Sequence, residues 1–268
     1  MDYKLFEAAL GGVALSSLAD EILLTDIVEE PVQMDTQTAP LALGDGMLRT
    51  VNRRKSLSVR LVYQIRTQDV ARRAEVRDLV AAWAANGGVL TVNTRPGKQL
   101  RVVCDTAPEQ GSSGKWTDDL EIVLTAYAVP YWEDAEKVSI SVNTVWNANR
   151  GEYYYANVIR PTGNVSAPLE FTMLYTGTET LNRLKIVCGS KAIEFTNLGV
   201  TRMNIVQITY DANGLFRAYK GTNVSLLPMR TPESEDELFA TPGTDNQIYV
   251  LSDAEIPGAS ITCRGRWL

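Results

Sequence analysis

The 268-residue sequence contains no histidine. Histidine is the side chain that most often changes charge near neutral pH and the commonest metal ligand, so its absence excludes Ser-His-Asp and Cys-His catalytic arrangements. Cysteine is also scarce: Cys104, Cys188 and Cys263 are far apart in the sequence and form no Cys-x-x-Cys pair. This spacing indicates neither a disulfide framework nor a zinc site. We therefore expect three reduced cysteines in strands of a protein made inside a cell, with no metal and no cofactor.

Positive charge and long apolar runs are scarce too. The formal net charge is -6 and the sequence pI is about 4.9, whereas proteins that grip nucleic acid through many phosphates need a basic surface. The apolar runs are too short to span a membrane, and Met1-Asp2-Tyr3-Lys4 does not open like a signal peptide. We expect no specific nucleic-acid binding and no membrane insertion. An acidic wall past which DNA slides remains compatible with this charge.

Adjacent carboxylates are the remaining candidates for acid–base catalysis. The pairs are Glu29-Glu30, Asp118-Asp119 and Glu133-Asp134, and a glycosidase works with two such groups. Neighbouring strand residues point to opposite faces, however, and each pair falls at an expected turn. The acidic cluster in residues 233–237 lacks the spacing of a calcium-binding loop. We interpret all of these acidic residues as solvated surface charges, so we expect that the protein is not an enzyme.

The clearest structural pattern lies between residues 57 and 132. From Leu57 to Ile65 apolar and polar residues alternate with one break, as in a half-buried strand. A helix is then expected over about residues 67–86, with Thr67 as its cap, an apolar stripe that includes Leu79, and a glycine C-cap after Asn86. Further alternating strands follow, and Pro130 ends the last of them. The pattern predicts a sheet with one helix packed on it.

The acidic segment before residue 137 is the expected junction between two domains, 1–136 and 137–268. Residues 1–56 read as short strands joined by loops. Beyond residue 137 only strands are expected, with Gly189-Ser190 and Asn213-Gly214 as hairpin turns. Short strands at this spacing are typical of a β-sandwich. The predicted fold class is mainly β with one α-helix.

An aromatic run in the second domain is a candidate contact surface. Tyr153, Tyr154 and Tyr155 are consecutive and lie close in sequence to Trp146. Exposed aromatics can stack on sugars or bind a protein partner. The alternative, which we favour, is a strand whose outer tyrosines cover the sandwich.

Three stretches taken together resemble the distal tail protein family of tailed bacteriophages and related prophage particles. The strand-helix-hairpin block closed by Pro130-Tyr131-Trp132 is similar to the ring-forming domain of that family. The other matching motifs are Gly11-Gly12, Leu23-Leu24-Thr25-Asp26-Ile27, Glu29-Glu30-Pro31, Leu43-Gly44-Asp45-Gly46, Pro168-Leu169-Glu170-Phe171 and Thr241-Pro242-Gly243-Thr244-Asp245-Asn246. The resemblance covers essentially the whole chain.

The resemblance implies an architecture and a mechanical role. Residues 1–136 would be a ring-forming (belt) domain, assembling into a homo-hexameric ring that joins the tail tube protein to the tail tip or baseplate hub protein. Residues 137–268 would be a galectin-like β-sandwich that lacks galectin-type sugar chemistry, since that pattern needs a histidine. Receptor-binding proteins would dock on the ring, and DNA would pass through its lumen without specific binding. The chain would be a virion protein, assembled in the host cytoplasm.

Two hypotheses about sites accompany this interpretation. If the ring lumen is acidic, its candidate lining residues are Asp20, Glu21, Asp26, Glu29 and Glu30. If instead the second domain is a carbohydrate- or receptor-binding module, Trp146 and Tyr153 to Tyr155 are the candidate contacts.

Overall fold

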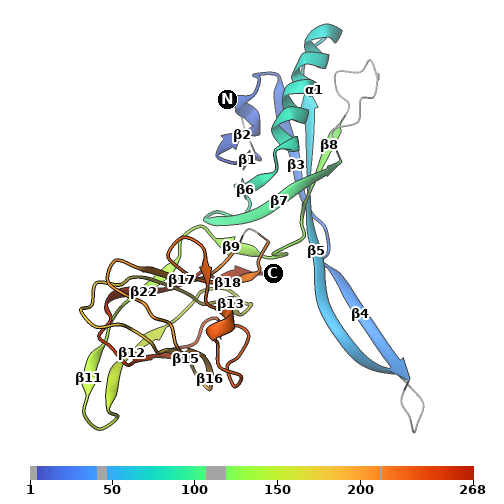
Figure 1. Ribbon diagram of the computed structural model, residues 1–268. Coiled ribbons are helices and arrows are strands. Elements are labelled where there is room, and N and C mark those ends of the chain that lie inside the picture. The colour runs from blue at the N-terminus through green and yellow to red at the C-terminus, as the bar shows by residue number, and fades with distance from the viewer. Residues whose placement is uncertain (1–4, 41–46, 107–118, 212) are drawn as a thin grey trace. The chain divides into compact units, whose positions relative to one another are not determined.

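The computed structural model describes residues 5–40, 47–106, 119–211 and 213–268 (Figure 1). The chain divides into two compact units, Met1–Trp132 and Glu133–Leu268. Strands dominate both units, and Val70–Ala85 forms α1, the one α-helix of the described residues. This confirms the predicted fold class. No helix in these ranges is long and apolar enough to cross a membrane.

Unit 1 contains an antiparallel sheet in which the strand order is β2-β1-β6-β7-β8-β5-β3. A short 3-10 helix, η1 (Leu15–Ser17), precedes β3, and β9 (Trp132–Asp134) lies at the boundary of the units. The remaining strands are β1 (Ala8–Leu10), β2 (Val13–Ala14), β3 (Ile22–Glu29), β4 (Gln33–Pro40), β5 (Met47–Ile65), β6 (Gly88–Val92), β7 (Lys98–Thr106) and β8 (Leu120–Ala126).

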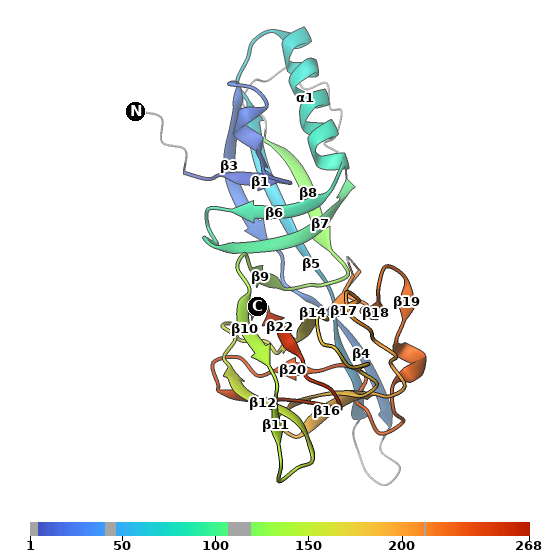
Figure 2. The same cartoon turned by 60° about the vertical axis from the view of Figure 1, so that its left-hand side comes forward.

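The predicted alternation in β5 sets the core of unit 1. The alternating apolar residues Leu57, Val59, Leu61, Tyr63 and Ile65 are all buried, with Leu61 paired to Ile122 of β8 on one side and to Ile27 of β3 on the other. Helix α1 runs along this sheet (Figure 2) and buries a stripe at helical spacing. The buried apolar residues of α1 are Val76, Val80, Trp83 and Ala84.

Two expectations for the helix were wrong in detail. It begins at Val70, and Asp69 is its cap, because the Asp69 carboxylate accepts from the backbone N–H groups of Ala71 (2.9 Å) and Arg72 (3.3 Å). The Thr67 hydroxyl instead accepts from the N–H of Asp69. Leu79 is 44% exposed, because it lies at the margin of the stripe rather than on it.

Within the first 56 residues, β1 to β4 are short strands as expected, but β5 departs from that pattern. Strand β5 starts at Met47 and is 19 residues long, and its first part pairs with β4 to form a two-stranded arm. Figure 1 shows this arm extending beyond the strands that pair with the second part of β5. Along β4, residues 34–38 are exposed on both faces. The arm has no apolar alternation of its own, so the two-residue period that marks a buried strand is missing from its sequence.

Unit 2 contains two antiparallel sheets, with strand orders β10-β22-β14-β17-β18-β19 and β11-β12-β21-β15-β16. Unit 2 also contains a two-stranded pair, β13–β20, the 3-10 helix η2 (Leu227–Met229) and β23. The strands are β10 (Val138–Asn143), β11 (Val145–Asn147), β12 (Glu152–Ile159), β13 (Ala167–Pro168), β14 (Glu170–Leu174), β15 (Leu184–Cys188), β16 (Lys191–Phe195), β17 (Ile205–Tyr210), β18 (Phe216–Lys220), β19 (Val224–Ser225), β20 (Phe239–Ala240), β21 (Asn246–Ser252), β22 (Pro257–Cys263) and β23 (Arg266–Trp267).

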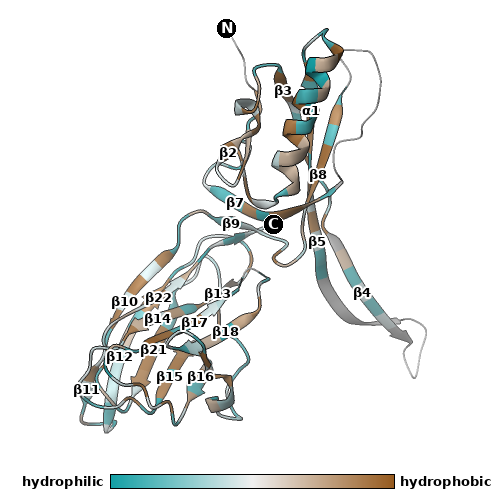
Figure 3. Ribbon diagram, turned by 45° about the horizontal axis from the view of Figure 1, so that its top comes forward, coloured by the Kyte–Doolittle hydropathy of each residue, from teal (hydrophilic) through white to brown (hydrophobic). Residues whose placement is uncertain are grey.

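The two larger sheets share one apolar core. Phe171 and Ile261 from one sheet belong to the same buried cluster as Phe195 and Val250 from the other. Figure 3 shows hydrophobic residues recurring along these strands with hydrophilic residues between them, which is the alternation of a β-sandwich. The two predicted hairpins are confirmed as β15–β16 and β17–β18.

The cysteines behave as expected from their spacing. Cys104, Cys188 and Cys263 lie in β7, β15 and β22 and are free thiols. Burial raises the pKa of the Cys188 thiol and raises that of Cys263 to about 12. Neither buried thiol is ionised at neutral pH, so their contribution is to packing.

Candidate functional site

The acidic residues proposed for a lumen divide between the two faces of the unit 1 sheet. Asp26 pairs with Val62 of β5, and cross-strand partners share a face, so Asp26 lies on the face that also carries Arg60 and Gln64. Glu30 follows on the same face by alternation, and its backbone N–H donates to Ser58. Asp20, in the turn before β3, is exposed. The open-face acids are therefore Asp26 and Glu30.

Glu21 and Glu29 are instead engaged by arginines. Arg72 of α1 binds Glu21, with Nε 2.9 Å from Oε1, and its hydrogen bond lowers the pKa of that carboxyl. Arg95, in the β6–β7 turn, binds Glu29 through two hydrogen bonds of 2.6 and 2.7 Å. The alternation of residues in the sequence predicts which face of the sheet an acidic residue lies on, but it does not show which acidic residues form ion pairs. These two carboxylates are structural.

The Glu29–Arg95 pair is completed by Trp132. The indole N–H of Trp132 donates to Glu29 Oε2 (3.2 Å), and the Arg95 guanidinium lies over the Trp132 ring at 5.6 Å from its centroid. Trp132 is fully buried. A bidentate arginine–carboxylate pair has defined geometry, so this cluster joins the end of β3, the β6–β7 turn and the last residue of unit 1.

The arm of unit 1 presents backbone groups for assembly. In the described part of the chain, β4 pairs with β5 and has no second strand beside it. A strand at the edge of a sheet can add a further strand through main-chain hydrogen bonds, and a two-stranded ribbon alone is only marginally stable in water. The arm is therefore suited to pairing with another polypeptide.

The candidate aromatic residues of unit 2 lie on the β11–β12 hairpin, and they do not form one platform. Trp146 is 57% exposed and meets Tyr153 edge-on, with ring centroids 5.4 Å apart. Tyr154 points to the opposite face and stacks on Tyr249 at 5.9 Å. Tyr155 packs against the sandwich core, and its hydroxyl donates to the Ser141 carbonyl.

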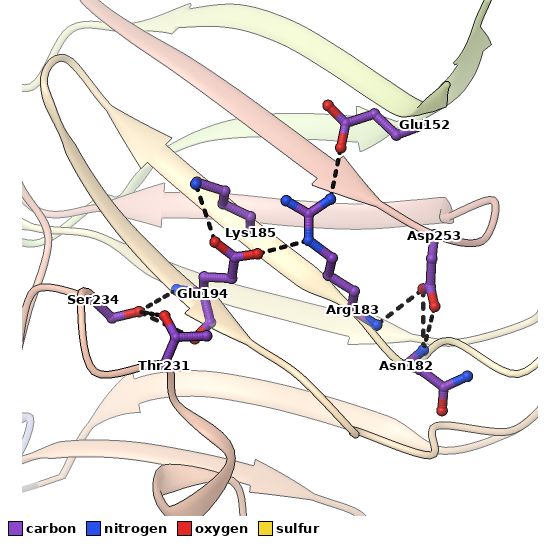
Figure 4. A network of polar contacts seen from close by, with 8 residues as sticks. All are labelled: Glu152, Asn182, Arg183, Lys185, Glu194, Thr231, Ser234 and Asp253. Carbon is purple, nitrogen blue, oxygen red and sulfur yellow. Dashed lines mark hydrogen bonds and ion pairs between the residues drawn. The ribbon is translucent and has the colours of Figure 1, made fainter. Parts of the chain in front are cut away.

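A network of charged residues crosses the outer face of the five-stranded sheet (Figure 4). Arg183 donates to Glu194 (2.6 Å) and to Glu152 (2.7 Å), and Lys185 pairs with Glu194 at 3.0 Å. Burial raises the pKa of Glu194, the hydrogen bonds from Arg183 and Lys185 lower it, and the net shift is downward. The Glu194 hydrogen bond raises the pKa of Arg183. The network is fixed in its charged form.

Sequence reasoning did not find this network. Arg183, Lys185 and Glu194 alternate with core residues on β15 and β16, and each has the pattern of an ordinary solvated strand residue. Their meeting with Glu152 depends on the strand order of the sheet. The acidic cluster 233–237 also proved to be ordinary, since Glu235 and Asp236 pair with Lys191 and Arg230. No three His, Cys, Asp or Glu side chains of the described residues gather as a metal site.

Other features expected from the sequence fall on residues that the structure does not describe. The Leu43-Gly44-Asp45-Gly46 motif lies outside the described residues, and so do residues 107–114, which the polar, glycine-rich sequence predicts to be a loop. Of the pair Asp118-Asp119, only Asp119 is described, and its carboxylate accepts from Gln64 (3.0 Å). That contact is on the open face of the sheet.

The chain is similar in structure to phage hub proteins over its whole length. It matches the SPP1 Dit (gp 19.1) protein, described as a paradigm of the hub adsorption apparatus in Gram-positive infecting phages, with a TM-score of 0.67, 14% identity, and coverage of 98% of this chain and 99% of that one. A chain from the phage P2 baseplate in its activated conformation with Ca gives a TM-score of 0.51 and 10% identity, with 97% of each chain covered. No protein-family model matches the sequence, and no curated protein matches it. The expected resemblance is confirmed at the level of the fold: this chain has the fold of the phage Dit proteins.

Proposed function

We propose that this protein is a structural component of a phage tail, a distal tail protein rather than an enzyme. The observation that carries the proposal is the likeness to SPP1 Dit, which spans both units and 98% of the chain. A likeness confined to one sandwich would indicate a shared module, since such folds serve many functions. A match of both units in the same order supports a shared role in the hub of a virion.

In this proposal unit 1 forms a homo-hexameric ring. The ring joins the tail tube protein to the tip or baseplate hub protein, and DNA passes through its lumen. Ring closure needs a heterologous interface between two different surfaces of the same chain. The position of β4 beside β5 at the edge of the arm supports this, because an edge strand can pair with a strand of a neighbouring copy. Unit 2 then provides a docking point for receptor-binding proteins. The ring is assembled in the host cytoplasm.

The mass of the purified chain in solution tests the ring. Native mass spectrometry and negative-stain electron microscopy, at rising concentration, are expected to show closed particles with six times the 29.5 kDa chain mass. A ring with another copy number would contradict the hexamer. A chain that stays monomeric at high concentration, with no ring in the images, would overturn the proposal.

The open-face acids give a second prediction. Replacing Asp26 and Glu30 with lysine is expected to slow genome release from particles that carry the variant, because cations on a lumen wall attract phosphates. A matched control is the double replacement of Glu75 and Asp78 on α1, which changes the charge equally on the other side of the sheet and should leave release unchanged. Ejection kinetics measure both variants. If particles with the native protein and particles with the Asp26 and Glu30 variant release the genome at the same rate, these acids do not line the lumen.

A further inference from the structure

A groove lies on the outer face of the five-stranded sheet in unit 2. Its lining comes from the β11–β12 turn and from outward positions of β12, β15 and β21, which alternate with core positions such as Ile186 and Val250. We call it the cationic groove. It is lined by Arg150, Glu152, Arg183, Lys185, Val187, Tyr249 and Leu251.

The groove carries an excess of positive charge in an acidic protein. Its lining has three cations and one carboxylate, and Glu194 beside it supplies a second carboxylate. The whole chain has a formal charge of -6. A local cationic surface attracts an anionic partner.

The cations are held in place before any partner arrives. Arg183 is fixed by Glu152 and Glu194, and its backbone N–H donates to Asp253 at 2.9 Å (Figure 4). Lys185 is held by Glu194. Ordering long side chains costs entropy on binding, and a network that has already ordered them removes part of this cost.

Arg150 is positioned differently, by aromatic rings. Its guanidinium lies 4.7 Å from the centroid of the Tyr154 ring, and Tyr154 stacks on Tyr249. A guanidinium over an aromatic face keeps its N–H groups free to donate at its edge. Within the described residues Arg150 has no carboxylate within ion-pair distance. The stacked tyrosines therefore support a cation here instead of presenting bare rings for a sugar.

We propose that the cationic groove docks an extended acidic segment of another polypeptide. The carboxylates of that segment meet Arg150 and Lys185, and an aliphatic side chain on the same face of the segment packs on Val187 and Leu251. The groove lies on a regular sheet face with an apolar floor and charged sides, which suits an extended chain that carries acidic and aliphatic residues on one face. This inference rests on the proposed function, because the partner would be another tail component.

Peptide binding to the full chain tests the groove. The probe is a fluorescently labelled acidic peptide, Asp-Leu-Glu-Asp-Leu-Glu, compared with its neutral counterpart, Asn-Leu-Gln-Asn-Leu-Gln, by anisotropy. We expect saturable binding of the acidic peptide with a Kd below about 1 mM, weakening as salt rises, and no saturation with the neutral one. The double variant Arg150→Gln, Lys185→Gln should bind roughly tenfold more weakly.

The matched control removes two cations elsewhere in the same unit. Arg160 and Lys191 are exposed and pair with Asp245 and Glu235, so Arg160→Gln, Lys191→Gln makes the same change in net charge and should leave binding unchanged. Equal loss in both double variants would show non-specific attraction and overturn the proposal. Unsaturable binding of the acidic peptide would also overturn the proposal. Binding of an oligogalacturonate without binding of the peptide would overturn it too, and would identify a site for acidic glycans.

Ring formation by the groove variant separates this inference from the proposed function. The double variant should assemble as the native chain does. If the native chain forms rings but does not bind the peptide, the groove proposal fails and the proposed function stands. If the native chain binds the peptide but never assembles, the proposed ring fails.

Discussion

Replacing Trp132 with alanine is expected to lower the free energy of unfolding of unit 1 by about 3–5 kcal/mol. The side chain is fully buried and is the largest of the completely buried side chains. Its removal leaves a cavity and also deprives Glu29 of one hydrogen bond and Arg95 of its aromatic face. Urea unfolding followed by far-UV circular dichroism measures the loss. Hydrogen exchange in β3, β6 and β7 assigns the transition to unit 1.

The matched control is Trp132→Phe. Phenylalanine keeps most of the apolar volume and the cation–π contact but has no N–H for Glu29, so this variant should lose about 1–2 kcal/mol. If alanine cost no more than phenylalanine, the cavity term would be absent and Trp132 would not anchor the end of unit 1.

The alternating strand shows what the sequence determines directly. From Leu57 to Ile65 a period of two residues predicts burial, and the structure buries every second residue, whereas Val62, which breaks the pattern, is half-buried. The same physics explains the helix, where a stripe at helical spacing predicts one buried side. Boundaries were less accurate, because Thr67 and Asp69 can both accept backbone protons and the structure uses Asp69 as the cap.

The arm could not be predicted from periodicity. The sequence of β4 and the first part of β5 has no apolar alternation and has the composition of a loop, while backbone pairing with each other makes them strands. Pairing is a long-range property of the chain. The arm is therefore visible only once the register of β5 is known.

The candidate sites illustrate the same limit. Of the five candidate lumen acids, Glu21 and Glu29 meet Arg72 and Arg95 from distant parts of the sequence. The cationic groove gathers Arg150 from the β11–β12 turn, Arg183 from the residue before β15, and Tyr249 from β21. No local pattern marks such a set, because its members are far apart in the sequence and each looks like an ordinary surface residue.

The likeness to phage hub proteins persists at 14% identity. A fold tolerates such divergence when apolar positions keep their period and their approximate volume, since cores accept many hydrophobic substitutions of similar size. Surface residues have no such constraint. This is why the fold is recognisable from loose motifs, whereas the groove and the arm must be established by experiments on this chain.

Replacing Gly163 with alanine is expected to lower the free energy of unfolding of unit 2 by about 3 kcal/mol. Gly163 has φ +107°, and an added Cβ would lie 2.2 Å from the backbone oxygen of Arg266. That oxygen accepts from the N–H groups of Asn164 and Val165. The Arg266 atom belongs to the backbone, and the position of an added Cβ is fixed by the backbone of residue 163, so no side-chain rotation relieves the clash. The C-terminal strand β23 must separate from this bridge.

Gly189→Ala is the control that isolates the clash. Gly189 also has positive φ, +61°, but an added Cβ there would meet nothing within 4 Å. Its replacement carries only the cost of the left-handed backbone, about 1 kcal/mol. Thermal unfolding gives both losses, and hydrogen exchange in residues 264–268 should increase in the Gly163 variant alone. Equal losses would mean that the backbone at Arg266 gives way, in which case β23 is not held by its bridge to Gly163.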